Sequence, residues 1–339
     1  MKQPPSFFTS VRLDAVDSVK AIAIIAIIVG HTPHAHDIPF LHSVVNSFHV
    51  PAFFIIAGFF IHDLPFRQAL PKYASRYLWP YAVTCLLLLI CDVSITIIKG
   101  GDFAHTALES VVKSLWGSGF CADELLFGYI PHVGAIWFLL ALFWAELFFS
   151  SSLSRFGLLP TALLSVTLYC AGLMAAQAIF LPWSLLPAAS ATLLMLVGLL
   201  IRRYDLLAKA YYLNRWLWVA IAAICVANIV FNQPVSMVLN RMGFNIIGLF
   251  CCIAETVGLI CLCHRLDIRF KWLGQNTLYI LCAHLLTLHV LPLHLESYSP
   301  HAIFLICLPI NLALSLSVAW LMKRFNILRC PFANTQSGK

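Results

Sequence analysis

Three ionisable residues stand at the two ends of an apolar run near the N-terminus. Asp17 and Lys20 precede the run 21–30, and His31 follows it. A carboxylate, an ammonium group and an imidazole are groups that transfer protons or act as nucleophiles. If this segment crosses a membrane, ionisable groups on it are costly unless they face the protein interior or a water-filled cavity. Their presence therefore predicts a functional site on this segment.

The spacing places Lys20 and His31 on one face of a helix. They are eleven residues apart, and in an α-helix that is three turns plus roughly 20°, or about 16 Å along the axis. Asp17 lies three residues before Lys20, close enough to pair with it and offset part of its burial cost. The alternative interpretation is a lysine that snorkels to the cytoplasmic edge and an interfacial histidine on the outside.

The rest of the chain is typical of a membrane protein. Of its 339 residues, 61% are hydrophobic and 10% are charged, and the mean hydropathy is +0.89. Soluble domains of this length do not have such a composition. We predict an all-α polytopic integral membrane bundle, a single domain over residues 1–339, with about ten transmembrane helices of roughly 20 residues each. The helices are expected near residues 13–33, 43–62, 77–98, 131–150, 157–176, 183–201, 215–232, 243–263, 273–292 and 302–322.

The basic residues predict that both termini are cytoplasmic. The chain has 21 Lys and Arg residues. With the N-terminus inside, only Lys99, Lys113 and Arg241 lie outside, which leaves 18 (21 − 3) on the cytoplasmic side. This split follows the positive-inside rule. The net charge of +7 is therefore interpreted as a topology signal, and no nucleic-acid partner is expected.

The cysteine and histidine spacings do not indicate a metal site. Nearly all of the 12 cysteines lie within predicted helices, and Cys121 alone is clearly in an external loop. Cys261, Cys263 and His264 lack the paired spacing of a structural zinc site, and the histidines between His34 and His49 have no diagnostic spacing. We expect no metal and no disulfide framework.

Five stretches of the chain, in order, resemble the landmarks of one family. They are residues 13–23 followed by His31, residues 49–60 (HVPAFFIIAGFF), residues 72–81 (KYASRYLWPY), residues 136–139 (IWFL) and residues 273–284 (LGQNTLYILCAH). Together they resemble the acyltransferase 3 family, in which an Arg or Lys, ten intervening residues and a His mark the first helix. Ala57 stands where the family usually has Ser. Tyr73 replaces the first Arg of its R-x-x-R motif, so that half is absent or displaced onto Lys72.

The resemblance implies a membrane O-acyltransferase, similar to fucose 4-O-acetylases. Such a protein moves an acyl group, most commonly acetyl, from cytoplasmic acyl-CoA to a hydroxyl of a cell-surface or exported glycan or of a lipid-linked sugar. The implied location is the bacterial inner membrane. Acetyl-CoA or another acyl-CoA is expected as co-substrate, with no tightly bound cofactor. The acceptor sugar, the acyl group and the oligomeric state stay open.

The candidate site residues fall into three groups. His31 is expected either to act as a general base or to take the acyl group itself, with Lys20 and Asp17 completing the catalytic set. Acyl-CoA is polyanionic, so its phosphates are expected at inner basic residues. These donor-binding candidates are Lys72, Arg76, Arg202 and Arg203, and possible acceptor or pocket residues are His49, Trp137, Tyr279 and His284. Tyr279 and His284 are five residues apart, about 140° on a helix, so they are not expected to share one narrow site.

Two other classes of function compete with an enzyme. Buried Lys, His and acidic groups also suit a proton-coupled transporter or an acyl-group exporter, but the hydropathy shows no matching inverted or parallel halves. A non-catalytic scaffold leaves Lys20 and His31 unexplained.

The orientation can be tested with reporter fusions. A phosphatase that is active only outside the cytoplasm should be active when fused after Gly117 and inactive when fused at Lys339, because loop 99–130 is expected outside and the C-terminus inside. Phosphatase activity from the fusion at Lys339 would contradict the ten-span arrangement.

Overall fold

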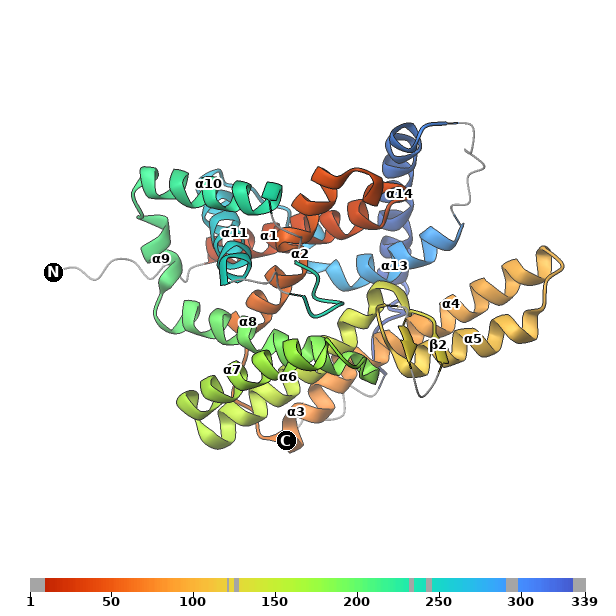
Figure 1. Ribbon diagram of the computed structural model, residues 1–339, viewed down its shortest axis with the longest axis horizontal. Helices are drawn as coiled ribbons and strands as arrows, with labels where there is room; N and C mark the ends of the chain where they lie inside the picture. Colours follow the sequence, from red (N-terminus) through yellow and green to blue (C-terminus); the bar gives the residue numbers. More distant parts are fainter. Residues whose placement is uncertain are drawn as a thin grey trace.

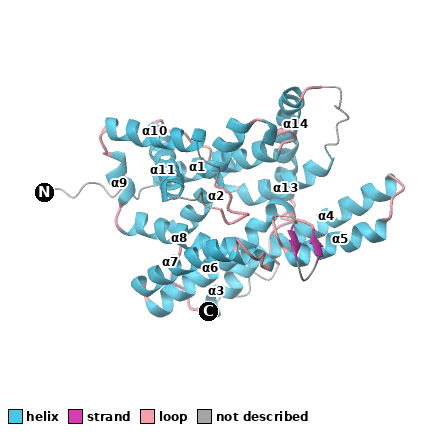
Figure 2. Ribbon diagram, in the orientation of Figure 1, coloured by secondary structure: helices cyan, strands magenta, loops and turns pink. Residues whose placement is uncertain are grey.

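A computed structural model of the chain describes residues 10–120, 122–124, 128–231, 235–241, 246–290 and 298–331. Helices dominate these residues, which confirms the predicted all-α membrane bundle. Two short antiparallel strands, β1 (Ala122–Glu124) and β2 (Gly128–Ile130), form a small hairpin beside the helices (Figure 2).

The helices range from single turns to seven turns in length. Figure 1 shows α6, α7 and α8 side by side, and the pair α4 and α5 extending away from the other helices. The bounds, in chain order, are α1 Ser10–His31, α2 Pro39–Phe59, α3 Phe66–Tyr73, α4 Trp79–Ile98, α5 Phe103–Trp116, α6 Trp137–Phe156, α7 Leu158–Ala175, α8 Leu185–Arg203, α9 Leu206–Tyr211, α10 Arg215–Phe231, α11 Ile246–Arg265, α12 Lys271–Gln275, α13 Thr277–Val290 and α14 Pro300–Arg324.

Seven helical segments of the described chain are long and apolar enough to cross a membrane. They contain α2, α3 with α4, α6, α7, α8, α11 and α14. The shorter apolar helices α10 and α13 also coincide with predicted spans. So does α1, whose first half carries Asp14, Asp17 and Lys20. These helices match the ten predicted segments one for one, although the number that cross the bilayer stays a prediction.

The predicted third span is part of a longer helical segment. α3 continues into α4 through a π-helical turn, Ala74–Leu78. Pro71 and Pro80 flank this turn, and neither has an N–H to donate to the helical ladder. The turn carries Arg76 and Tyr77, so it changes the direction in which these two side chains point relative to a regular helix.

The loop predicted over 99–130 contains a helix that the hydropathy did not reveal. α5 begins at the N-cap Asp102, whose carboxylate accepts hydrogen bonds from the N–H groups of Ala104 and His105. It packs back along α4, with the Tyr81 hydroxyl donating to the Ser114 carbonyl at 2.7 Å. Cys121, placed in this loop by the sequence, lies outside the described residues.

Helices α2 and α8 cross at very close range, because each has a glycine at the crossing. A Cβ on Gly58 would overlap the backbone of Met195, and a Cβ on Gly198 would overlap the backbone of Ile55. Small residues of this kind let membrane helices approach and pack. α6 and α8 are mostly buried, whereas α4 and α7 are mostly exposed and so suited to face lipid. The α2–α8 contact therefore holds the centre of the bundle together.

Replacement of Gly198 by Ala should destabilise the protein, because the added methyl must push α2 away from α8. The expected loss is about 1–3 kcal/mol, the usual cost of overpacking, measured as a lower unfolding midpoint in detergent. Gly258→Ala is the matched control, since the new methyl would meet only the edge of the Trp218 ring. Equal midpoints for the two variants would contradict the close crossing.

Candidate functional site

One face of α1 lines a series of three cavities. Lys20, Ile24 and Ile27 line a cavity of about 500 Å³, called here the Lys20 cavity. Ile27 and His31 line a small chamber of about 90 Å³, the central chamber. His31 also lines a third cavity of about 560 Å³, the Lys113 cavity. Lys20, Ile24, Ile27 and His31 occupy positions i, i+4, i+7 and i+11 of α1. Lys20 and His31 therefore share one face of the helix, as their spacing predicts.

An ion pair and a hydrogen bond, both to Asp17, hold Lys20 in place at one end of this face. The Lys20 Nζ atom lies 2.6 Å from Asp17 Oδ1, and Gln275 Nε2 donates to Asp17 Oδ2 at 3.2 Å. Gly274 allows this approach, because a Cβ there would overlap the Asp17 backbone. Lys20 and Gln275 both line the Lys20 cavity. The ammonium group is therefore held at the cavity wall.

The opposite wall of the Lys20 cavity contains a buried carboxylate that sequence reasoning missed. Glu146 of α6 accepts a hydrogen bond from the Tyr77 hydroxyl, and Arg76 Nη1 lies 3.7 Å from Glu146 Oε2. The Glu146 side chain is 3% exposed, while that of Arg76 is 59% exposed. A buried carboxylate needs such partners. Glu146 thus holds one side of Arg76, which lines the Lys20 cavity. The position of Glu146 inside an apolar helix is the sequence signal that could have identified it.

Lys72 and His62 add further basic groups to the same cavity. With Lys20 and Arg76 they give its walls four side chains that can carry positive charge, beside the aromatic rings of Phe53, Phe60 and Phe138. Such a cavity suits a ligand with anionic groups and a long, less polar arm.

The central chamber, which His31 lines, adjoins the Lys20 cavity at three apolar side chains. Ile27, Phe138 and Leu281 line both the Lys20 cavity and the chamber. We call these three side chains the collar. His49 and Trp137, two of the predicted pocket residues, line the chamber with His31.

A second histidine packs against His31. The ring centroids of His31 and His284 are 5.5 Å apart, with the planes tilted by 56°. His284 is completely buried, whereas His31 is exposed, facing the central chamber and the Lys113 cavity that it lines. His31 is therefore the member of the pair that a reactant can reach.

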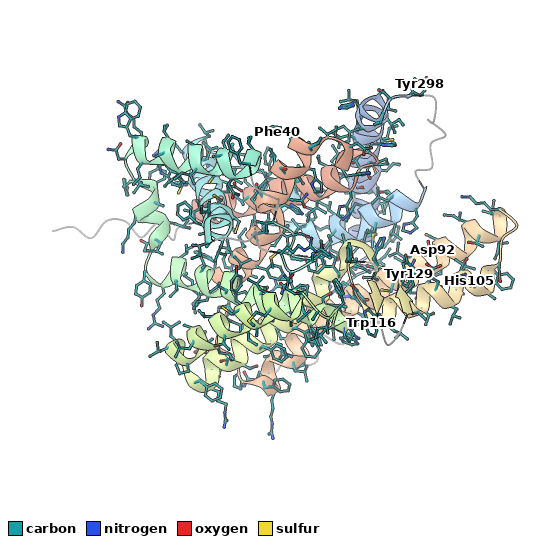
Figure 3. All side chains as sticks on the ribbon, in the orientation of Figure 1. Phe40, Asp92, His105, Trp116, Tyr129 and Tyr298 are labelled. Atoms are coloured by element: carbon teal, nitrogen blue, oxygen red, sulfur yellow. The ribbon has the colours of Figure 1, made fainter. Side chains whose placement is uncertain are left out.

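The Lys113 cavity carries a network of charged groups from three helices. Asp92 of α4 accepts from Lys113 Nζ at 2.9 Å and from Ser110 Oγ at 3.0 Å, both on α5. His289 Nε2 of α13 lies 3.2 Å from the other Asp92 oxygen. Figure 3 labels Asp92 and Tyr129 near the base of the α4 and α5 pair. The network ties this pair to α13 and forms one wall of the cavity.

His132 forms part of the opposite side of the Lys113 cavity. It precedes the span that starts at Gly134, and burial, together with the positive charges of Lys113 and His289, lowers its pKa. Its Nδ1 atom accepts a hydrogen bond from the Gly134 N–H at 3.2 Å. The neutral ring therefore carries its proton on Nε2, where it is available to a ligand hydroxyl.

The remaining predicted residues do not line these cavities. Arg202 donates to the Ile61 carbonyl at 2.8 Å, Arg203 is exposed, and neither is among the lining residues. Tyr279 also lines none of the three, while His284, five residues on, contacts His31. Of the eleven candidates, His31, Lys20, Lys72, Arg76, His49 and Trp137 line the cavities, and Asp17 and His284 support them.

Comparison with known proteins agrees with the sequence motifs. A family model described as an acyltransferase domain, the one for acyltransferase 3 proteins, matches residues 13–320. Neither the curated proteins nor the solved structures that were compared gave a match.

Proposed function

This chain belongs to the acyltransferase 3 family, and from that premise we propose that it transfers an acyl group from cytoplasmic acyl-CoA to a glycan hydroxyl on the other side of the membrane. Acetyl is the proposed group, and the bacterial inner membrane the proposed location. The observation that carries the proposal is the position of His31, between a basic cavity on one side and a separate polar cavity on the other.

The Lys20 cavity is assigned to the donor. Its basic residues Lys20, Lys72 and Arg76 belong to the side that the positive-inside rule places in the cytoplasm, where acyl-CoA is found. Lys20 is about 16 Å from His31 along the axis of α1. Lys20 is therefore assigned to the phosphates or the arm of the donor, and the extended pantetheine arm bridges the distance to His31. Asp17 and Gln275 position Lys20 for this contact.

The Lys113 cavity is assigned to the acceptor. It combines Lys113, His132 and His289 with the aromatic side chains Tyr129 and Trp137. Sugars are bound by such mixtures, in which polar groups bond to hydroxyls and aromatic rings cover apolar faces. The cavity also reaches His31, so a hydroxyl of the acceptor can approach the imidazole from this side.

The reaction needs one proton acceptor at His31. In the direct route, His31 removes the proton from the acceptor hydroxyl while its oxygen attacks the thioester carbonyl carbon. The C–O bond forms, the C–S bond breaks, and the leaving CoA thiolate takes the proton from His31. In the two-step route, a His31 nitrogen attacks the thioester carbonyl carbon, the C–S bond breaks, and the leaving thiolate takes the proton from the other imidazole nitrogen. The acceptor oxygen then attacks the acyl carbon, the C–N bond breaks, and the hydroxyl proton returns to the imidazole. Both routes yield the ester and CoA, and neither calls for a tightly bound cofactor.

Replacement of Arg76 by Ala should weaken acetyl-CoA binding by about 1–3 kcal/mol, because a charge-assisted contact to phosphate is lost. Binding of acetyl-CoA to the detergent-purified protein measures this. Arg203→Ala is the control and should bind like the wild type, since Arg203 lies outside the cavity. The reverse pattern would move the donor site to the end of α8.

Replacement of His31 by Ala should reduce acyl transfer by at least about 10²-fold, the lower end of general acid–base contributions, with membrane levels unchanged. Lys20→Ala should also lose most activity, whereas Lys20→Arg keeps the cation and should retain much of it. The assay is the acyl content of surface polysaccharide in a deletion strain that expresses each variant. His36→Ala is the histidine control, because the His36 side chain is 74% exposed and lines none of the three cavities. Normal acylation by a well-expressed His31→Ala protein would favour the transporter interpretation.

A further inference from the structure

The collar lies between the Lys20 cavity and the chamber that His31 lines. The central chamber behind it holds about 90 Å³, against about 500 Å³ for the Lys20 cavity. An acyl group that enters from the donor side must pass Ile27, Phe138 and Leu281 before it reaches His31. In an acyl-CoA the acyl group is the leading end of the arm, so it is the part of the donor that must fit this space.

The collar is part of the packed interior. Ile27, Phe138 and Leu281 are 5%, 6% and 4% exposed. The Phe138 ring makes edge contacts with Phe53 at 5.5 Å and with Phe54 at 5.1 Å between centroids, which fixes its orientation. Because close-packed interiors resist insertion of even single methylene groups, the collar has little freedom to widen for a longer chain.

The chamber is also lined by apolar side chains close to His31. Val50, Ala135 and Trp137 complete its apolar wall near His31, and Trp137 makes an edge contact with Phe138 at 6.1 Å. Trp137 and Phe138 are therefore the rings that an acyl chain longer than acetyl meets in the chamber.

We propose that the collar and the central chamber select the acyl group by length, admitting acetyl and rejecting butyryl and longer chains. This inference rests on the proposed function, and it assigns Phe138 and Ile27 as specificity-determining residues. In an apolar pocket one additional methylene changes the ratio of kcat/KM values by about 10- to 200-fold. Butyryl has two more methylenes than acetyl, so the wild type should prefer acetyl-CoA by at least about 10-fold.

The test compares two donors in the native membrane. Inverted inner-membrane vesicles, whose cytoplasmic face is outward, carry the protein with its own acceptor. They receive acetyl-CoA or butyryl-CoA labelled in the acyl group, and the label in the glycan fraction gives the ratio of the two transfer rates. Vesicles from a strain without the gene give the background.

The variants distinguish an effect of the collar residues on donor preference from a general effect of core packing. Phe138→Ala should lower the acetyl preference by about 10-fold or more, and Ile27→Ala should lower it in the same direction. Phe143→Ala is the matched control: Phe143 lies on the same helix, is 2% exposed and lines none of the three cavities. It should leave the ratio unchanged even if it lowers both rates. If Phe138→Ala fails to accumulate, Ile27→Val removes a single methyl group and should shift the ratio in the same direction.

The possible outcomes test length selection by the collar separately from the proposed acyl transfer. A wild type that transfers acetyl and butyryl at equal rates, or collar variants that keep the wild-type ratio, would overturn length selection while leaving acyl transfer in place. Labelling no stronger than the background with both donors would instead count against the proposed function. A shifted ratio in Phe143→Ala equal to that in Phe138→Ala would show that packing in general, and not the collar, sets the preference.

Discussion

Hydrocarbon does not solvate ionised or strongly polar side chains, and α1 carries several of them into the bundle, Lys20 and His31 among them. Lys20 and His31 can be accommodated only if the other helices surround α1 and leave space along one of its faces. α2, α11, α12 and α13 all pack against α1, and the three cavities lie along its remaining face, where α2, α6 and α13 supply most of the other lining residues that lie on helices. The Asp17 and Gln275 contacts at Lys20 and the His284 ring beside His31 complete the surroundings of these two groups. The positions of the polar residues on α1 therefore determine where the cavities lie.

The wall opposite α1 depends on close helix packing. Gly58 and Gly198 let α2 and α8 meet backbone to backbone, which aligns the α2 residues Phe53 and His49 with the cavities. α6 contributes Phe138 and Glu146, two turns apart on one face, to the collar and to the wall of the Lys20 cavity. Phe138 and Glu146 lie on the same face of one helix. A shift of α6 would therefore move the collar and Arg76, the partner of Glu146, together.

The sequence predicts the elements of this fold better than their contacts. Apolar runs located the spans, and the helical period placed Lys20 and His31 on one face, because both signals are local. The hydrogen bond from Gln275 to Asp17 joins residues that are 258 positions apart. The Tyr77–Glu146 and Asp92–His289 pairs likewise form only through tertiary packing. No local pattern specifies such contacts. α5 is different: the N-cap Asp102 and the left-handed Gly117 that bound it were visible signals, and attention to capping residues would have found it.

The cavities bear on the choice between transfer and transport. A carrier of the alternating-access type opens its substrate site to one side at a time, by moving one part of the bundle against another. Here the Lys20 cavity and the Lys113 cavity share no lining residue, and both are partly open in the same conformation. The collar side chains lie between them, buried in the packed interior. Passage of a whole substrate would require Ile27, Phe138 and Leu281 to separate, whereas group transfer requires only that an acyl carbonyl reach His31 from one side and a hydroxyl from the other. The geometry therefore favours an enzyme in which the acyl group alone crosses the collar, while its two much larger carriers stay on opposite sides.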